Sequence, residues 1–379
     1  VCADDTPHFS LEAPGGAKVS VKISNRVAQI KPPATIMVGM KAMELRAQGH
    51  DIISLGFGEP DFDTPDHIKQ AAVDAIWKGE TKYPPVDGTP ALKDAIIRKL
   101  QTENQLSYDK TQIFVSNGAK QSLFNLLVSI LNPGDEVIVP APYWVSYPDM
   151  IKIADGEPVI LNCAAENGFK ITPKQLEASI TDLTRLLIIN SPSNPTGKVY
   201  SAADYRALAD VLLEYPKVTV VCDDIYEHIY WGDEPFHTLL NVCPELANRT
   251  VIINGVSKAY AMTGWRIGYA AGPKEIITEM RKVQGQSTSG ACSIAQAAAV
   301  EALTGPQDCL AEMRTEYKRR YAYLLEALNA IDGVDCEDSD GAFYAFPSFT
   351  QIIDEMDDVR DDVELAAWML EHAGVAMVP

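Results

Sequence analysis

Residues 250–272 read TVIINGVSKAYAMTGWRIGYAAG, and this stretch decides how the rest of the chain is interpreted. The β-branched run Thr250–Ile253 predicts a buried strand, and Ile267–Gly272 predicts a second one. A glycine-punctuated loop between them carries three polar side chains, Ser257, Lys258 and Arg266. A lysine that follows a buried strand can direct its amine at a ligand in a crevice, although a single lysine is far more often a solvated surface charge. The stretch therefore predicts a ligand site only if neighbouring strand ends supply its other parts.

The composition limits the classes of protein to which this chain can belong. Its 379 residues carry a formal net charge of −20 at pH 7, with 46% hydrophobic and 22% charged residues. This length predicts one large domain with a smaller one, because a single core rarely grows beyond ~250–300 residues. The negative charge argues against a nucleic-acid binder and gives no support for binding to anionic membranes. No run approaches the ~18 apolar residues of a membrane-spanning helix.

The seven cysteines are scattered along the chain without a Cys-x-x-Cys pair. An odd, scattered set indicates neither a disulfide framework nor a zinc site. We therefore expect no metal, and a reducing, cytoplasmic location. The first twenty residues lack the hydrophobic core of a signal peptide, and residues 1–22 are interpreted as a flexible tail.

Short apolar runs alternate with helical patterns between Gln112 and Gly272. The runs are continuously hydrophobic, so we expect a mostly parallel sheet with both faces covered by helices. Besides the two strands above, the runs are Ile113–Val115, Val137–Val139, Pro158–Leu161, Leu186–Ile189 and Val218–Val221. The expected fold class is α/β, a three-layer α/β/α domain accompanied by a smaller α+β domain.

The patterns outside the sheet suggest how the chain divides. Residues 23–62 are expected to form an N-terminal arm and part of the small domain, and residues 63–295 the large ligand-binding domain. Residues 296–379 are expected to form the C-terminal small domain. Residues Gly56–Pro65 are expected to form a long loop between the first two parts, because two glycines and two prolines in this stretch oppose regular structure.

Ligands of open α/β sheets bind beyond the carboxyl ends of the strands, so the residues that follow each run matter most. At the first strand end, Gly118 opens a helix whose free N–H groups suit a phosphate, although an ordinary helix cap explains it equally. At the second, Trp144 could lie flat against a planar ring or belong to the core. Farther along, Asn194 sits on a rigid loop with two prolines and could donate to a ring oxygen.

Asp223 comes directly after the run Val218–Val221. A carboxylate that leaves a buried strand needs a cationic partner, because an unpaired buried charge is costly. A protonated pyridine nitrogen would serve, and so would an internal ion pair or a role as helix cap. Tyr226 lies three residues on, in place to hydrogen-bond the same ring. Together with Lys258, these strand ends supply the parts of a site for pyridoxal 5′-phosphate, an electron sink held by a lysine Schiff base.

On these motifs the chain resembles the fold-type I, class I aminotransferases, and within them the branch of bacterial aspartate and aspartate/prephenate aminotransferases. The resemblance runs from about Ile23 to the last residue. The motifs that carry it are Lys31–Thr35, Gly58–Pro65, Ser116–Lys120, Asn194–Gly197, Asp223–Tyr226, Ser257–Lys258 and Gly264–Arg266.

The resemblance implies a role for each motif residue. It makes Lys258 the Schiff-base lysine and general base, with Asp223 and Tyr226 as the other catalytic residues. The residues implied in cofactor binding are Tyr83, Gly118, Ala119, Lys120, Trp144, Asn194, Asp223, Tyr226, Ser257, Lys258 and Arg266. The residues implied in substrate binding are Thr35, Gly56, Lys120, Trp144 and Asn194. Tyr83 would reach the phosphate of a partner subunit, which implies a homodimer with shared active sites.

The implied activity moves an amino group between L-aspartate or glutamate and 2-oxo acids such as 2-oxoglutarate and oxaloacetate, with prephenate as a further acceptor to test. A broad or aromatic aminotransferase stays open, as does another fold-type I enzyme such as a C–S lyase or decarboxylase. A transcription regulator built on this domain would need a basic DNA-binding module. A nicotinamide dehydrogenase would need a GxGxxG motif at the first helix, which is absent there.

The sequence departs from the family pattern in two places. Gly255 stands three residues before the lysine, where some relatives carry a phosphate-binding serine. The chain ends at Gly374–Pro379, where relatives continue into a strand that carries the arginine for the substrate α-carboxylate. A bidentate arginine orients Cα over the lysine. We therefore expect the 379-residue chain to be truncated and, as written, to bind the cofactor yet transaminate poorly.

Overall fold

The computed structural model describes residues 10–12, 18–20, 22–30, 34–56 and 58–379. Of these, residues 10–12, 18–20 and 34–37 are described by their backbone only. Within the predicted flexible tail, β1 (Ser10–Glu12) and β2 (Lys18–Ser20) pair as an antiparallel hairpin, which the sequence did not suggest. A four-residue helix, α1 (Asn25–Ala28), follows.

A seven-stranded sheet forms the centre of the molecule, with the strand order β4-β10-β9-β8-β7-β5-β6. All strands run parallel except β10, which pairs antiparallel with both β4 and β9. The strands are β4 (Ile113–Ser116), β5 (Glu136–Ala141), β6 (Glu157–Asn162), β7 (Thr184–Asn190), β8 (Thr219–Asp223), β9 (Thr250–Gly255) and β10 (Gly268–Ala271). Each of the seven predicted apolar runs is one of these strands.

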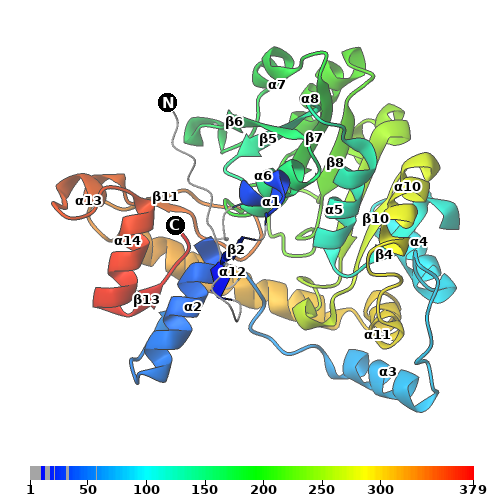
Figure 1. Ribbon diagram of the computed structural model, residues 1–379, viewed down its shortest axis with the longest axis horizontal. Helices are drawn as coiled ribbons and strands as arrows, with labels where there is room; N and C mark the ends of the chain where they lie inside the picture. The colour runs from blue at the N-terminus through cyan, green and yellow to red at the C-terminus, as the bar shows by residue number, and fades with distance from the viewer. Residues whose placement is uncertain (1–9, 13–17, 21, 31–33, 57) are drawn as a thin grey trace.

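Helices cover both faces of this sheet, so the expected three-layer α/β/α arrangement is confirmed (Figure 1). The helices α5 (Ala119–Ile130), α6 (Ser146–Ile153) and α10 (Lys274–Gly285) pack their apolar residues on one face. The helices α7 (Pro173–Ser179), α8 (Ala202–Glu214) and α9 (Leu239–Val242) pack on the other.

The edge strand β6 differs from the expectation that both faces of every strand are covered. Its residues are exposed or half-buried along the whole strand, whereas β4 and β9 are buried throughout. β4 is the other edge strand, but apolar side chains of neighbouring helices cover its Ile113 and Val115. A continuous apolar run therefore cannot tell which edge strand the rest of the chain will cover.

A third cluster of helices surrounds the β4 and β10 end of the sheet: α3 (Asp66–Trp77), α4 (Pro90–Glu103) and α11 (Ser293–Thr304). The helix α4 starts at Thr89, whose side chain accepts a hydrogen bond from the Leu92 amide, and Pro90 occupies the first helical position. This helix matters below because its last turn reaches the carboxyl ends of β8 and β9.

Most of the remaining elements lie on the left side of Figure 1, near the C-terminal end of the chain. The strand β3 (Ile53–Ser54) pairs in parallel with β13 (Val375–Ala376). Around them are α2 (Ala34–Ala47), α12 (Asp308–Asn329), β11 (Asp335–Cys336), β12 (Pro347–Ser348), α13 (Thr350–Glu355) and α14 (Asp362–Trp368). Among the described helices, none combines the length and the apolar character that crossing a membrane requires.

Candidate active site

Lys258 follows β9 and lies at the centre of a cluster of polar and aromatic side chains. Its Nζ donates a hydrogen bond to the backbone oxygen of Gly58 and lies 5.6 Å from the centre of the Tyr226 ring. Burial lowers the pKa of the Lys258 amine to about 8, and although the Glu59 carboxylate opposes this shift, the positive charge of Arg266 adds to it. A substantial fraction of the amine is therefore neutral, and so nucleophilic, near neutral pH.

Asp223 is the last residue of β8, beside β9, and is only 6% exposed. Its Oδ2 accepts a hydrogen bond of 2.6 Å from the hydroxyl of Tyr147. Its Oδ1 is buried and has no hydrogen-bond partner among the described residues. Burial raises the pKa of Asp223 to about 6, although the Tyr147 hydrogen bond and the charge of Lys258 oppose the shift. The free oxygen is thus a buried acceptor that suits a cationic N–H donor.

Tyr226 and Asn194 converge on a third residue, Tyr344. The hydroxyls of Tyr226 and Tyr344 share a short hydrogen bond, and Asn194 Nδ2 donates to the same Tyr344 oxygen at 3.2 Å. Asn194 is held by its own backbone N–H, which donates to Asn190 Oδ1 at 2.7 Å. The loop after β7, the turn after β8 and the C-terminal part of the chain therefore meet at one point.

The N-terminus of α5 faces Arg266. Gly118 caps this helix with φ at +83°, and a Cβ there would lie 2.4 Å from Arg266 Nη2. Only glycine therefore lets the guanidinium lie against the cap. Arg266 Nη2 donates to the Asn117 oxygen at 3.3 Å, and the nearby Ser257 is buried. Free N–H groups, a hydroxyl and a guanidinium together make an anion site.

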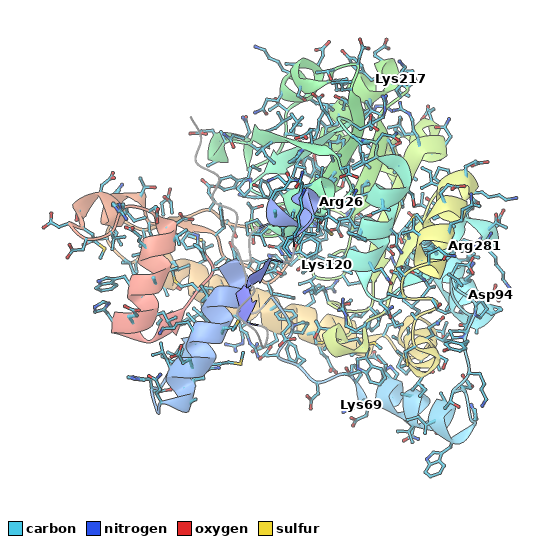
Figure 2. The ribbon with its side chains drawn as sticks, in the orientation of Figure 1. Arg26, Lys69, Asp94, Lys120, Lys217 and Arg281 are labelled. Atoms are coloured by element: carbon cyan, nitrogen blue, oxygen red, sulfur yellow. The ribbon has the colours of Figure 1, made fainter. Side chains whose placement is uncertain are left out.

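Lys120, in the first turn of α5, lies over the indole ring of Trp144. Its Nζ is 4.6 Å from the ring centre and donates to Ser146 Oγ at 3.1 Å. Figure 2 labels Lys120 in the middle of the molecule. Burial lowers the pKa of Lys120, and the positive charge of Arg266 lowers it further. Trp144 is half-buried and also packs edge-to-face on Tyr147 at 5.3 Å, so it belongs to both the core and the site.

Comparison with known proteins agrees with this geometry. The family model "Aminotransferase class I and II" matches residues 50–379. The chain belongs to this family. It is 51% identical to the aspartate/prephenate aminotransferase of Nitrosomonas europaea, over 95% of this chain and 92% of the relative. It is 52% identical to the enzyme of the same name from Cereibacter sphaeroides, over 94% and 90% of the two chains.

Solved structures confirm the fold of this aminotransferase. The aspartate aminotransferase of Rhizobium meliloti matches with a TM-score of 0.90 and 49% identity, over 94% of this chain and 90% of that one. The aspartate aminotransferase of Thermus thermophilus with maleate matches with a TM-score of 0.89 and 44% identity, over 95% and 91%. Aminotransferases of this family depend on pyridoxal 5′-phosphate, as the sequence led us to expect.

Two features of this aminotransferase fit that cofactor. The unpartnered Oδ1 of Asp223 offers a buried carboxylate to a protonated ring nitrogen. The glycine at the α5 cap leaves the helix N-terminus and Arg266 free for a phosphate. The amine of Lys258 lies in the same cluster, 5.6 Å from the centre of the Tyr226 ring.

Of the remaining predicted residues, Tyr83 and Gly56 make no described contact with this cluster within the chain. The Tyr83 side chain is 96% exposed and so projects from the surface of this subunit. Gly56 lies beside the last residues of the chain, where an added Cβ would contact Val378 at 3.6 Å. Thr35 lies on α2, and its side chain is outside the described part of the structure.

Three residues of the cluster were missed in the sequence. Tyr147 holds Asp223, Tyr344 meets Tyr226 and Asn194, and the Gly58 carbonyl holds Lys258. The segment Gly341–Phe346 consists of a glycine followed by alanines and aromatic residues, and no strand-end rule assigns it to the site. Gly255 is explained, because a Cβ there would lie 2.9 Å from the Ile267 oxygen, leaving little room for a serine.

Proposed function

We propose that this aminotransferase exchanges amino groups between L-aspartate or glutamate and 2-oxo acids such as 2-oxoglutarate and oxaloacetate, with prephenate as a further acceptor to test. The observation that carries this proposal is the pair of cations near Lys258, since Arg266 and Lys120 both lower the pKa of its amine, while the carboxylates of Glu59 and Asp223 act in the opposite direction. On a chain of net charge −20, such local charge is what draws in a dianionic substrate. The names of the relatives support it, and maleate in the Thermus structure is itself a dicarboxylate.

We assign the residues of the site to the cofactor as follows. Asp223 would pair with the protonated ring nitrogen, Tyr226 and Asn194 would hydrogen-bond the ring hydroxyl, and Trp144 would stack on the ring. The cofactor phosphate would be bound by Gly118, Ala119, Ser257 and Arg266, with Lys120 beside it. When bound, the cofactor accepts the electron pair that the substrate Cα–H bond releases.

The chain's own groups carry the proton chemistry in this proposal. Lys258 would hold the cofactor covalently and, once displaced as a free amine, would move the proton from substrate Cα to the cofactor carbon, a step worth ~10²–10⁴ in rate. Asp223, ionised above pH 6, keeps the ring nitrogen protonated. Lys120 and the backbone near Gly56 orient the substrate, and the buried aromatic side chains exclude water.

The remaining parts of the proposal concern assembly and location. We propose a homodimer in which Tyr83 of each subunit reaches the phosphate of the other, since this tyrosine is 96% exposed on its own subunit. We also propose that the large cofactor-binding domain spans residues 63–295 and that the segments before and after it form the arm and the small domain. A cytoplasmic location is also proposed, supported by the free cysteines among the described residues.

A panel of amino donors tests the proposed substrate class. We expect aspartate and glutamate to exceed neutral amino acids in kcat/KM, with stoichiometric formation of the matching 2-oxo acid. Lys120→Ala should raise the KM for aspartate by ~10-fold and leave that for alanine nearly unchanged, because it removes one partly buried charge from the carboxylate. The matched control is Lys69→Ala, which removes a lysine that pairs with Asp66 at the surface of α3. Equal losses for both donors would contradict this role for Lys120.

Attachment of the cofactor should depend on pH through Lys258. Because burial lowers the pKa of this amine to about 8, the amine is protonated below pH 8 and neutral above it. We expect the rate constant for attachment to the cofactor-free protein to rise ~10-fold per pH unit below pH 8 and to level off above it. Stopped-flow absorbance measures this rate. A rise that continues to pH 10 would show an unperturbed amine.

A further inference from the structure

A buried carboxylate that the proposed chemistry does not use lies directly behind the site. Glu227 follows Tyr226 in the chain and is 7% exposed. It forms a short ion pair with Lys99, which is 2% exposed. Burial alone would raise the pKa of Glu227, but the charge and hydrogen bond of Lys99, together with His228 and the hydrogen bond of Asn104, lower that pKa to about 2. Glu227 is therefore ionised in the interior of the enzyme.

The donors to Glu227 come from separate elements. Lys99 lies in the last turn of α4, and Asn104, which caps that helix, donates from Nδ2 to Glu227 Oε2 at 2.8 Å. Asn254 lies in β9 and donates from Nδ2 to Glu227 Oε1 at 2.7 Å. Lys99 Nζ also donates to Asn104 Oδ1 at 2.7 Å, which closes the network. A single carboxylate thus joins α4, the turn after β8 and the end of β9.

A metal ion does not account for this cluster. Oxygen and nitrogen atoms of Glu103, Glu227 and His228 lie within 4.8 Å of one another, a spacing that suits a cation. However, the ammonium of Lys99 is bonded to Glu227 and lies 3.6 Å from Glu103, so positive charge is already present. The His228 ring hydrogen-bonds Glu103 at 2.8 Å.

A contribution to stability does not account for the buried network around Glu227 either. Burying two charges costs desolvation that their attraction roughly offsets, and well-packed apolar side chains of similar size serve stability as well or better. What an apolar pair cannot supply is directional bonds to two asparagines on different elements. The network therefore has a geometric role.

The position of this network indicates what it aligns. The ladder between β8 and β9 ends at the pair Asp223 and Ile253, with one further bond from the Asp224 amide to the Ile253 oxygen. Beyond it the two segments separate, one turning through Tyr226 and the other running on to Lys258. The hydrogen bond from Asn254 to Glu227 spans this divergence.

We propose that Glu227 is a positioning residue for transamination, which fixes the segment of Lys258 relative to the segment of Asp223 and Tyr226 by accepting the hydrogen bond of Asn254. Asn254 also accepts the Gly255 amide at 2.7 Å, so the constraint passes into the chain that leads to the lysine. This inference rests on the roles assigned under the proposed function.

The test removes the link and leaves the ion pair in place. Asn254→Ala deletes one donor to Glu227, which keeps Lys99 and Asn104. The matched control is Asn125→Ala, which deletes an equally buried amide that donates to Gln284 at 3.1 Å between α5 and α10. Both variants are purified with bound cofactor. We then measure kcat, KM, the melting temperature, and the pH at which the visible absorbance of the bound cofactor is halfway through its change.

We expect both variants to melt at a lower temperature, but only Asn254→Ala to shift the absorbance midpoint, by roughly half to one pH unit, as loss of one buried hydrogen bond allows. Its kcat should fall by ~10–100-fold with KM changed less than about twofold, because a small misplacement of the lysine acts on the chemical step. A midpoint and kcat equal to those of Asn125→Ala would overturn the proposal.

A second variant covers the case in which Asn254→Ala does not fold. Asn254→Ser keeps a small polar side chain but is too short to make the 2.7 Å hydrogen bond that Asn254 donates to Glu227, so the link breaks, and we expect the same midpoint shift. An unchanged midpoint in a folded Asn254→Ser enzyme overturns the proposal. The proposed function fails separately, through normal turnover by Lys258→Ala, whatever Asn254→Ala does.

Discussion

Lys258→Ala is expected to lower transamination by at least ~10⁴-fold, because the variant loses both the covalent attachment and the general base. Its amine is the one that the described structure places against Tyr226 and Phe343, at 5.6 and 5.7 Å from their ring centres. The contacts at Gly118, Ser257 and Arg266 remain, so the variant should still bind the cofactor reversibly. Absorbance spectra, equilibrium dialysis of the cofactor and single-turnover assays with aspartate measure these effects.

A matched control separates this loss from a general effect of deleting a lysine. Lys217 is exposed and lies just before β8, at the end of the sheet opposite Asp223, as Figure 2 labels it. Lys217→Ala should therefore keep the parent's absorbance and turnover. Wild-type turnover in Lys258→Ala would refute the assignment of this residue and with it the proposed site.

Asp223→Asn is expected to lower turnover by ~10³-fold while the protein stays folded. The amide has nearly the shape of the carboxyl group and can still accept the hydrogen bond of Tyr147, which is 2.6 Å away in the parent. It cannot carry the negative charge that keeps a ring nitrogen protonated, and leaving such a buried cation unpaired costs ~3–5 kcal/mol. Asp223→Glu should recover part of the activity. Turnover and cofactor affinity are measured for each variant.

The neighbouring residue supplies the control for Asp223→Asn. Asp224 is equally buried, and burial, followed by the charge of Glu227, raises its pKa well above the usual range. Burial thus favours the uncharged form of this carboxyl group, which an amide resembles, and Asp224→Asn should change turnover by less than about threefold. A loss as large as that of Asp223→Asn would show that the end of β8, rather than the charge of Asp223, determines activity.

The residues that sequence reasoning found share one property, which is that each lies at the carboxyl end of a strand or within a few residues after it. Gly118, Asn194, Asp223 and Lys258 could be placed together because parallel strands end at the same edge of a sheet. The apolar runs marked those strands without any knowledge of the fold. The family resemblance then added the identity of the cofactor.

The residues that were missed reach the site across long stretches of chain. Tyr147 points into the site from α6, and Tyr344 arrives from the C-terminal part, more distant from Asn194 than any local pattern extends. The burial of Glu227 with Lys99 was equally invisible, since both letters look like ordinary surface charges. Such contacts depend on how elements pack, which periodicity does not encode.

The pairing of β3 with β13 determines the order in which this chain can finish folding. Ile53 and Ser54 are made early in synthesis, but their strand partners, Val375 and Ala376, emerge near the end of the described chain. The small core of Ala42, Ile52, Leu370 and Ala376 cannot close until then, whereas the strands of the central sheet are all available by Ala271. Contacts of such sequence separation form slowly, because closing a long loop costs entropy before any contact offsets it. During synthesis on the ribosome, the segment through β3 therefore stays unpaired and exposed until β13 has been made, while the central sheet can already assemble.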